Sequence, residues 1–193
     1  MTILVVGGAG YIGSHMVQML AANKLDCVVL DNLSTGFADA LTNITGSVEL
    51  VVGDLADKSL LTQLFAQHEF TAVMHFAAFS QVGESIQLPQ KYYSNNLVNT
   101  INLLEVMAAH QVKQLVFSST AAVYGEPVQP VISELHPLAP INPYGRSKLA
   151  IEWVLQDYAS AYGLKSVALR YFNAAGADPL GANGERHDPE THL

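Results

Sequence analysis

The sequence predicts an α/β fold with a doubly wound parallel sheet. Short apolar runs rich in β-branched residues alternate along the chain with longer segments of helical periodicity, an order typical of parallel strands joined by helices. The short runs are apolar at nearly every position, as expected when helices cover both faces of a sheet. The chain has 193 residues, of which 50% are hydrophobic, and this suits one globular domain with a sizeable core.

Six strands are expected, and each is a short apolar run bounded by glycine or polar residues. They lie at residues 3–6, 27–30, 48–52, 72–76, 115–118 and 167–171. The helices are expected at residues 12–22, 58–67, 92–110 and 143–162, where apolar residues recur at helical spacing. Asp57 is a suitable N-cap, Pro143 suits a first helical turn, and Gly163 is placed to end the last helix.

The charge balance is acidic, and it argues against a nucleic-acid partner. There are 17 Asp and Glu residues against 9 Lys and Arg residues, and no dense basic run. No segment resembles a signal peptide or is long and apolar enough to span a bilayer. The single Cys27 lies in an apolar run, where a buried thiol is the expected state. We therefore expect a cytoplasmic protein without a membrane partner.

A glycine-rich turn follows the first expected strand directly. Gly7, Gly10 and Gly13 are spaced three apart, and the next helix begins within the turn. Glycines permit a tight turn, a close approach of the backbone to a pyrophosphate, and close helix packing. The helix N-terminus then offers free amides and a partial positive charge. The strand–turn–helix context makes this a dinucleotide-binding signal of the Rossmann type.

A carboxylate stands where a dinucleotide site needs one. Asp31 ends the second expected strand, 18 residues after Gly13, where a carboxylate accepts hydrogen bonds from the ribose hydroxyls. The same charge repels a 2′-phosphate, and no arginine stands near it. The sequence therefore predicts NAD rather than NADP as the cofactor.

A tyrosine and a lysine follow further along the chain at helical spacing. Tyr144 and Lys148 lie on one helix face, and Thr120 ends the fifth expected strand. A tyrosine ordinarily has a pKa near ~10, and a lysine ammonium and a nicotinamide charge would both lower this pKa. Tyr144 would then accept a proton from an alcohol while hydride leaves to NAD, and Thr120 would hydrogen-bond the same oxygen. An aromatic anchor and a solvated lysine are the plainer interpretation, but the glycine turn and Asp31 favour catalysis.

Together these motifs resemble the extended short-chain dehydrogenase/reductase family, and within it the UDP-glucose 4-epimerases. The stretches that carry the resemblance are residues 7–13, 31–36, 53–55, 75–85, 92–96, 117–125, 143–148 and 170–173. The resemblance covers the whole chain. It implies an isomerase of galactose metabolism that oxidises the C4 hydroxyl of a UDP-sugar, lets the 4-keto sugar rotate, and returns hydride to the other face. UDP-glucose and UDP-galactose would be interconverted in this way.

The resemblance also implies roles for particular residues. Tyr144, Lys148 and Thr120 would be catalytic, and Thr120, Tyr144 and Asn173 would contact the substrate. The cofactor would be bound by Gly7, Gly10, Tyr11, Ile12, Gly13, Asp31, Asn32, Leu33, Ser34, Thr35, Gly36, Asp54, Leu55, Phe76, Ala77, Ala78, Phe79, Ser80, Asn95, Ser118, Tyr144, Lys148, Tyr171 and Phe172.

Two positions bear on where the chain stands within that family. Some members carry lysine where this chain has Ser80, so one charged contact to the diphosphate is absent. The related dehydratases place an acidic residue just after the strand-end threonine, whereas Ala121 and Ala122 stand here, which argues against elimination chemistry. His187, Asp188, Glu190 and His192 match no strong zinc spacing, so no metal is expected.

The resemblance implies a second, C-terminal substrate domain that this sequence does not include. Residues 1–173 would form the NAD-binding Rossmann domain, and residues 174–193 would begin the connection to the substrate domain. Three alternatives stay open: a catalytically silent NAD-binding module, another sugar-nucleotide 4-epimerase, and a simple alcohol dehydrogenase. The family is often dimeric through two long helices, here near residues 92–110 and 144–162, so a homodimer is expected.

Overall fold

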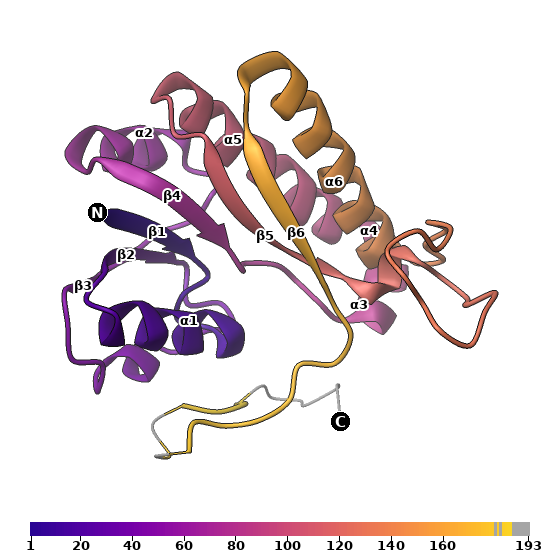
Figure 1. The fold of residues 1–193 in the computed structure, drawn as a ribbon, viewed down its shortest axis with the longest axis horizontal. Helices are drawn as coiled ribbons and strands as arrows, with labels where there is room; N and C mark the ends of the chain where they lie inside the picture. Colours follow the sequence, from indigo (N-terminus) through magenta and orange to yellow (C-terminus); the bar gives the residue numbers. More distant parts are fainter. Residues whose placement is uncertain (180, 182, 187–193) are drawn as a thin grey trace.

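In the computed structural model, which describes residues 1–179, 181 and 183–186, a six-stranded parallel sheet forms the centre of the chain (Figure 1). The strands are β1 (Thr2–Val6), β2 (Asp26–Asp31), β3 (Val48–Val52), β4 (Phe70–His75), β5 (Gln114–Thr120) and β6 (Lys165–Tyr171). Their order is β3-β2-β1-β4-β5-β6. Strand order reverses between β1 and β4, where a doubly wound sheet binds its ligand. The fold class predicted from the sequence is confirmed.

Helices cover the sheet and end where the local sequence signals predict. α1 (Tyr11–Ala22) lies against β1 and β2, whereas α2 (Lys58–Gln67), α5 (Asn99–Ala109) and α6 (Pro143–Tyr162) lie behind the sheet in Figure 1. The Asp57 side chain caps α2 by accepting from Leu60 N–H. Asn142 caps α6 in the same way, and Gly163 ends it with a positive φ of 71°.

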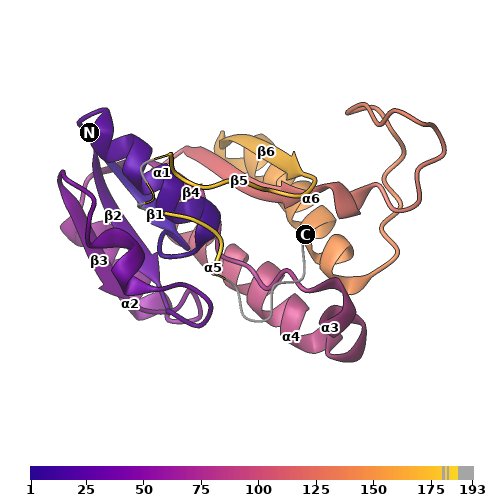
Figure 2. The same ribbon diagram turned by 90° about the horizontal axis from the view of Figure 1, so that it is seen from below.

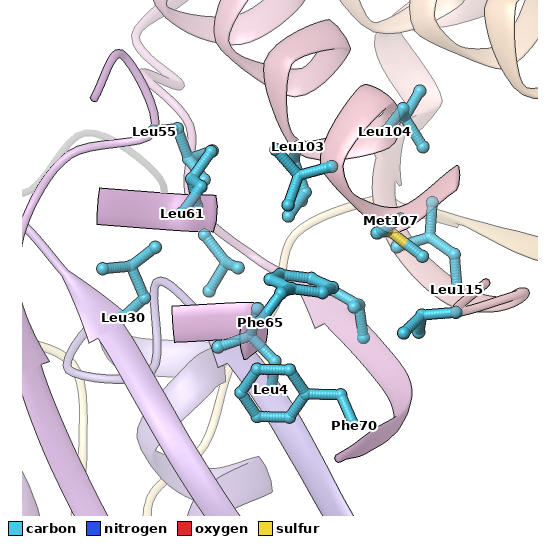
Figure 3. Close-up of a cluster of buried hydrophobic side chains, with 14 of the residues drawn as sticks. Leu4, Leu30, Leu55, Leu61, Phe65, Phe70, Leu103, Leu104, Met107 and Leu115 are labelled. Atoms are coloured by element: carbon cyan, nitrogen blue, oxygen red, sulfur yellow. The ribbon is translucent and has the colours of Figure 1, made fainter. Parts of the chain in front are cut away.

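The alternation of side chains along β1 divides the core into two layers. Leu4 and Val6 pack with α2, α5 and α6, whereas Ile3 and Val5 pack with α1. Figure 3 shows the first of these layers, in which Phe65 of α2 lies between the sheet and α5. Burial on both faces explains why the strands are apolar throughout.

The sequence predicted one helix over residues 92–110, and here the prediction was wrong in detail. The structure has α4 (Pro89–Tyr92), a π-helical segment η2 (Tyr93–Val98) and α5 in succession. A further short helix, α3 (Val82–Gln87), and the 3-10 turns η1 (Ala38–Leu41) and η3 (Ala121–Val123) were not predicted. π-helical turns are rare and often occur at functional sites, and η2 carries the buried Asn96.

Two irregular segments leave the sheet at its functional end. The loop between β5 and α6 extends away from the domain in both views (Figures 1 and 2). The chain after β6 folds back toward α1 instead, and the Tyr11 hydroxyl donates to the Gly176 carbonyl at 2.6 Å. Within the described residues, no helix is long and apolar enough to cross a membrane.

Candidate active site

A cleft of about 1270 Å³, open to solvent, lies at the carboxyl ends of the strands. Its wall brings together the glycine turn after β1, the ends of β2, β4, β5 and β6, and the first turns of α6. The predicted site residues that line it are Gly7, Gly10, Tyr11, Ile12, Gly13, Asp31, Asn32, Ser34, Thr35, Gly36, Asp54, Leu55, Phe76, Ala77, Ala78, Phe79, Ser80, Asn95, Ser118, Thr120, Tyr144, Lys148, Tyr171 and Phe172. Residues from the whole length of the chain therefore meet in one place.

Two predicted residues, Leu33 and Asn173, are not part of the cleft lining. Leu33 has a positive φ of 57°, and its backbone N–H donates to Asp31 Oδ1 at 2.9 Å. It therefore supports the Asp31 carboxylate from outside the cleft. Asn173 is exposed just beyond the end of β6.

Six further residues line the cleft without having been predicted as site residues: Val6, Leu30, Gly53, Ser119, Ala174 and Glu185. Val6 and Leu30 directly precede the glycine turn and Asp31, so their position was implied by those motifs. Ala174 and Glu185 reach the cleft because the chain folds back after β6, and no local pattern in the sequence signals that return.

The glycine turn leaves no room for a side chain at two of its glycines, Gly7 and Gly13. A Cβ on Gly13 would lie 2.1 Å from the carbonyl oxygen of Gly7, and a Cβ on Gly7 would lie 2.4 Å from Ala77 N. Gly7 also has a positive φ of 78°, which glycine adopts at little cost. At Gly10, by contrast, the nearest atom to a Cβ would be 3.4 Å away. Gly7 and Gly13 therefore shape the turn, and Gly10 borders the cleft.

The N-terminus of α1 meets the chemical needs of a diphosphate. Gly10 is its N-cap, no side chain caps the helix, and its first turn contains no acidic residue. The first amides of a helix have no partner within the helix, and they carry the positive end of its dipole. This end of α1 therefore suits an anion.

Two carboxylates that line the cleft are fixed by hydrogen bonds. Asp31 Oδ2 accepts from Ala9 N–H at 2.9 Å, and the carboxylate is buried. Asp54 accepts from the side chains of Asn32 at 2.6 Å and Asn99 at 3.3 Å. Both groups are acceptors held ready for hydroxyl or amine donors.

Tyr144 and Lys148 extend from α6 toward the end of β5, as the sequence predicted. The Lys148 ammonium donates to the Ser118 carbonyl at 2.8 Å, and burial lowers its pKa to about 7. Burial raises the pKa of Tyr144, and a hydrogen bond with Thr120 acts in the opposite direction. The lowered Tyr144 pKa expected from the sequence includes the charge of bound nicotinamide, so it stays a prediction for the chain with NAD, whereas without NAD removal from water outweighs the hydrogen bond.

His75 is a buried histidine near Lys148. His75 Nε2 is 2.8 Å from Thr100 Oγ1, and burial followed by the Lys148 charge lowers the His75 pKa to about 3. The imidazole is therefore neutral at physiological pH. The Lys148 ammonium lies 4.8 Å from the centroid of the Phe117 ring, which gives the cation a favourable aromatic face.

The buried Asn96 of η2 joins the cleft-lining loop after β4 to α6. Its amide makes two 3.0 Å hydrogen bonds with the backbone of Phe79 and donates to Ser147 Oγ at 3.3 Å. Ser147 Oγ in turn donates to the Tyr144 carbonyl at 2.7 Å. Two walls of the cleft are thereby fixed relative to each other.

An ion pair joins α6 to β6. Arg170 of β6 donates from Nε and Nη2 to the two oxygens of Glu152 at 3.1 and 2.6 Å. Ser119, at the end of β5, donates to the same carboxylate. The guanidinium also donates to the Tyr124 hydroxyl at 3.0 Å. These contacts connect β5, β6 and α6 directly beside Thr120.

No group of three or more His, Cys, Asp or Glu residues that could hold a metal ion is found within the part of the chain that the structure describes. The four residues whose spacing was considered in the sequence, His187, Asp188, Glu190 and His192, lie outside the described residues.

Comparison with known proteins places these features in a family. The model of the NAD dependent epimerase/dehydratase family matches residues 3–192. UDP-glucose 4-epimerases of Halalkalibacterium halodurans and Lacticaseibacillus casei are 54% and 53% identical over 193 residues, which is 100% of this chain and 57% of each relative. The chain thus spans a little over half the length of these curated relatives.

Solved structures show the same similarity. The UDP-glucose 4-epimerase of Brucella ovis in complex with NAD has a TM-score of 0.95 and 49% identity, covering 100% of this chain and 58% of that one. The enzyme of Bifidobacterium longum in complex with NAD+ and UDP has a TM-score of 0.93 and 39% identity, covering 97% and 58%.

Proposed function

The chain belongs to the NAD dependent epimerase/dehydratase family, and we propose that its cleft binds NAD and serves the interconversion of UDP-glucose and UDP-galactose. The observation that carries this proposal is the meeting of three features in one cleft. These are the glycine turn with α1, the Asp31 carboxylate, and the set of Thr120, Tyr144 and Lys148. The similarity to UDP-glucose 4-epimerases over the whole chain supports the choice of substrate.

The glycine turn and the carboxylates beside it suit the diphosphate and adenosine of NAD. The amides of α1 would hold the diphosphate, and Asp31 would accept from the adenosine ribose hydroxyls. Asp54 and Leu55 would border the adenine. Lys148 is the one cationic side chain among the described residues that line the cleft. With Ser80 in place of a lysine, the diphosphate charge would therefore be balanced mainly by backbone amides.

The catalytic residues would act on the hydroxyl at sugar C4. NAD held by the residues named above would supply the hydride acceptor and donor for C4 of the sugar. The Tyr144 oxygen would take the hydroxyl proton and later give it back, because a general base must also serve as the acid of the reverse step. The Thr120 hydroxyl would hydrogen-bond the reacting oxygen. Lys148 and the nicotinamide charge would offset the effect of burial on the Tyr144 pKa.

Assay of the 193-residue chain with UDP-galactose and NAD tests this proposal. We expect UDP-glucose to form without net release of NADH, and Tyr144→Phe to abolish its formation. NAD binding without turnover would identify a catalytically silent module, and net NADH release would identify a simple dehydrogenase. A preference for N-acetylated UDP-sugars would identify another sugar-nucleotide 4-epimerase. Each of these three outcomes would contradict the proposed activity.

The domain boundary after residue 173 stays a proposal, with residues 174 onward forming a connection to the sugar-binding part. Two described residues of this connection, Ala174 and Glu185, are part of the cleft lining. In a longer chain, this segment would join the sugar-binding part to the NAD-binding cleft.

A homodimer through η2, α5 and α6 is also proposed. Val98 and Trp153 on these segments are 52% and 56% exposed, and large apolar side chains at that exposure favour an interface. Light scattering on the wild-type chain and on Trp153→Glu tests it. We expect a dimer that the glutamate weakens, and an unchanged dimer in Trp153→Glu would contradict this interface.

A further inference from the structure

The buried ring of Tyr92 lies beside two aromatic rings of the cleft lining, those of Phe79 and Tyr144. Tyr92, the last residue of α4, is 0% exposed and is not part of the cleft lining. Its ring centroid lies 6.0 Å from that of Phe79 and 6.4 Å from that of Tyr144. The interplanar angle with Tyr144 is 78°, an edge-on arrangement. Such pairs are more favourable than burial of their area alone would give.

The Tyr92 ring is fixed at its far end by charged groups. The Tyr92 hydroxyl donates to Glu84 Oε2 at 2.8 Å, and the Lys91 ammonium donates to Glu84 Oε1 at 2.7 Å. The same ammonium lies 4.3 Å from the centroid of the Phe79 ring. The hydrogen bond from Lys91, followed by that from Tyr92, lowers the pKa of Glu84, so the anchor is an ionised carboxylate at neutral pH.

We infer that Tyr92 is a positioning residue for Tyr144, and that its ring, anchored on Glu84, limits the rotation of the Tyr144 phenol and keeps water from one side of it. The inference rests on the proposed function, in which the Tyr144 oxygen carries the proton. A phenol at the start of a helix can turn about two side-chain torsions. A fixed neighbouring edge removes part of that freedom, and it contributes to the burial that raises the Tyr144 pKa.

A purely structural role for Tyr92 predicts a different pattern. If Tyr92 only fills the core, its replacement lowers stability and leaves the ionisation of Tyr144 unchanged. If it positions Tyr144, the loss of the ring changes that ionisation, and a phenylalanine, which keeps the ring without the Glu84 hydrogen bond, restores it in part. Burial and Glu84 raise the Tyr92 pKa above its ordinary value, and Tyr92→Phe removes the Tyr92 phenol from the titration altogether.

The test is a pH titration of the chain labelled with ¹³C at tyrosine Cζ, followed by NMR without NAD. The Tyr144 resonance is identified by its loss in Tyr144→Phe. In Tyr92→Leu we expect the Tyr144 midpoint to fall from its wild-type value toward the ordinary tyrosine pKa of ~10. In Tyr92→Phe the midpoint should lie between those of the wild type and Tyr92→Leu, because the aromatic edge is kept while the hydrogen bond to Glu84 is lost.

A matched control separates positioning from general loss of packing. Phe65 is another buried aromatic residue, which contacts Phe70 and His110 and is not part of the cleft lining. Phe65→Leu should lower the melting temperature but leave the Tyr144 midpoint unchanged. A wild-type midpoint in Tyr92→Leu, or an equal shift in Phe65→Leu, would overturn the inference. If Tyr92→Leu shows no cooperative unfolding, Tyr92→Met is judged by the same criteria.

The titration uses the chain without NAD, so it is independent of the proposed activity. Failure to bind NAD or to epimerise a UDP-sugar would refute the proposed function and leave the effect of Tyr92 on Tyr144 measurable. An unchanged midpoint in a chain that does bind NAD would refute the positioning role alone.

Discussion

The side-chain amide of Asn96 pairs with both backbone polar groups of Phe79. The Phe79 N–H donates to Asn96 Oδ1 at 3.0 Å, and Asn96 Nδ2 donates to the Phe79 carbonyl at 3.0 Å. The side-chain amide thus forms the pair of backbone hydrogen bonds that a neighbouring strand would otherwise provide, and it does so for the loop after β4. The Asn96 side chain is only 1% exposed, and it holds the partly buried backbone of Phe79 in place.

Asn96→Leu should therefore lower both the stability of the chain and its affinity for NAD. It removes the side-chain partner of two partly buried backbone groups of Phe79, at a cost of roughly 1–3 kcal/mol in unfolding free energy. We expect NAD affinity to weaken about tenfold, measured by calorimetry beside urea unfolding. Asn23→Leu removes an exposed amide that bonds only within its own helix end and should leave NAD binding unchanged. Equal weakening by both variants would contradict this account.

The glycine turn allows a separation of folding from binding. Gly13→Ala places a methyl group against the Gly7 carbonyl at 2.1 Å, and backbone atoms cannot move aside cheaply. Gly10→Ala has 3.4 Å of room but puts its methyl group on the cleft wall. We expect Gly13→Ala to lower the melting temperature, and Gly10→Ala to melt like the wild type while binding NAD less tightly. The reverse pattern would show that the turn is arranged differently.

The ion pair beside Thr120 should contribute far more to stability than the exposed one near α1. The Arg170 and Glu152 side chains are 20% and 6% exposed, against 49% and 62% for Arg186 and Asp39. Arg170→Met leaves a buried carboxylate unpaired, at about 3–5 kcal/mol, whereas Arg186→Met should lose no more than about 1 kcal/mol. Urea unfolding of both variants makes the comparison, and similar losses would contradict it.

Lys148 should make the stability of the NAD-free chain depend on pH. Burial lowers its folded-state pKa from 10.5 to about 7, so between these values the unfolded chain binds more protons. The free energy of unfolding should therefore rise with pH across this window, and Lys148→Met should remove that rise. The measurement is urea unfolding of both chains from pH 6 to pH 10. A constant difference between them would contradict a buried amine with a lowered pKa.

Much of this arrangement follows from local sequence, and some of it cannot. The strands, the turn at Gly7 and the caps at Asp57 and Gly163 are set by short-range patterns, so their prediction succeeded. The π-helical segment carries Asn96, which bonds to Phe79 seventeen positions away in sequence, and helical periodicity does not encode such a contact. Glu185 reaches the cleft only because the chain folds back after β6.

The sequence also could not predict whether burial or hydrogen bonding has the larger effect on the Tyr144 pKa. The spacing from Tyr144 to Lys148 indicates a shared helix face, but it does not say how deeply either group is buried. The structure shows that burial dominates both groups, raising one pKa and lowering the other.

The central claim is that this cleft binds NAD through the glycine turn and Asp31, and calorimetry with NAD and NADP tests it most directly. We expect one NAD to bind per 193-residue chain, NADP to bind at least about tenfold more weakly because its 2′-phosphate meets Asp31, and Asp31→Ala to weaken NAD while narrowing that difference. A chain that binds no NAD, or that binds both dinucleotides equally well, would contradict the claim.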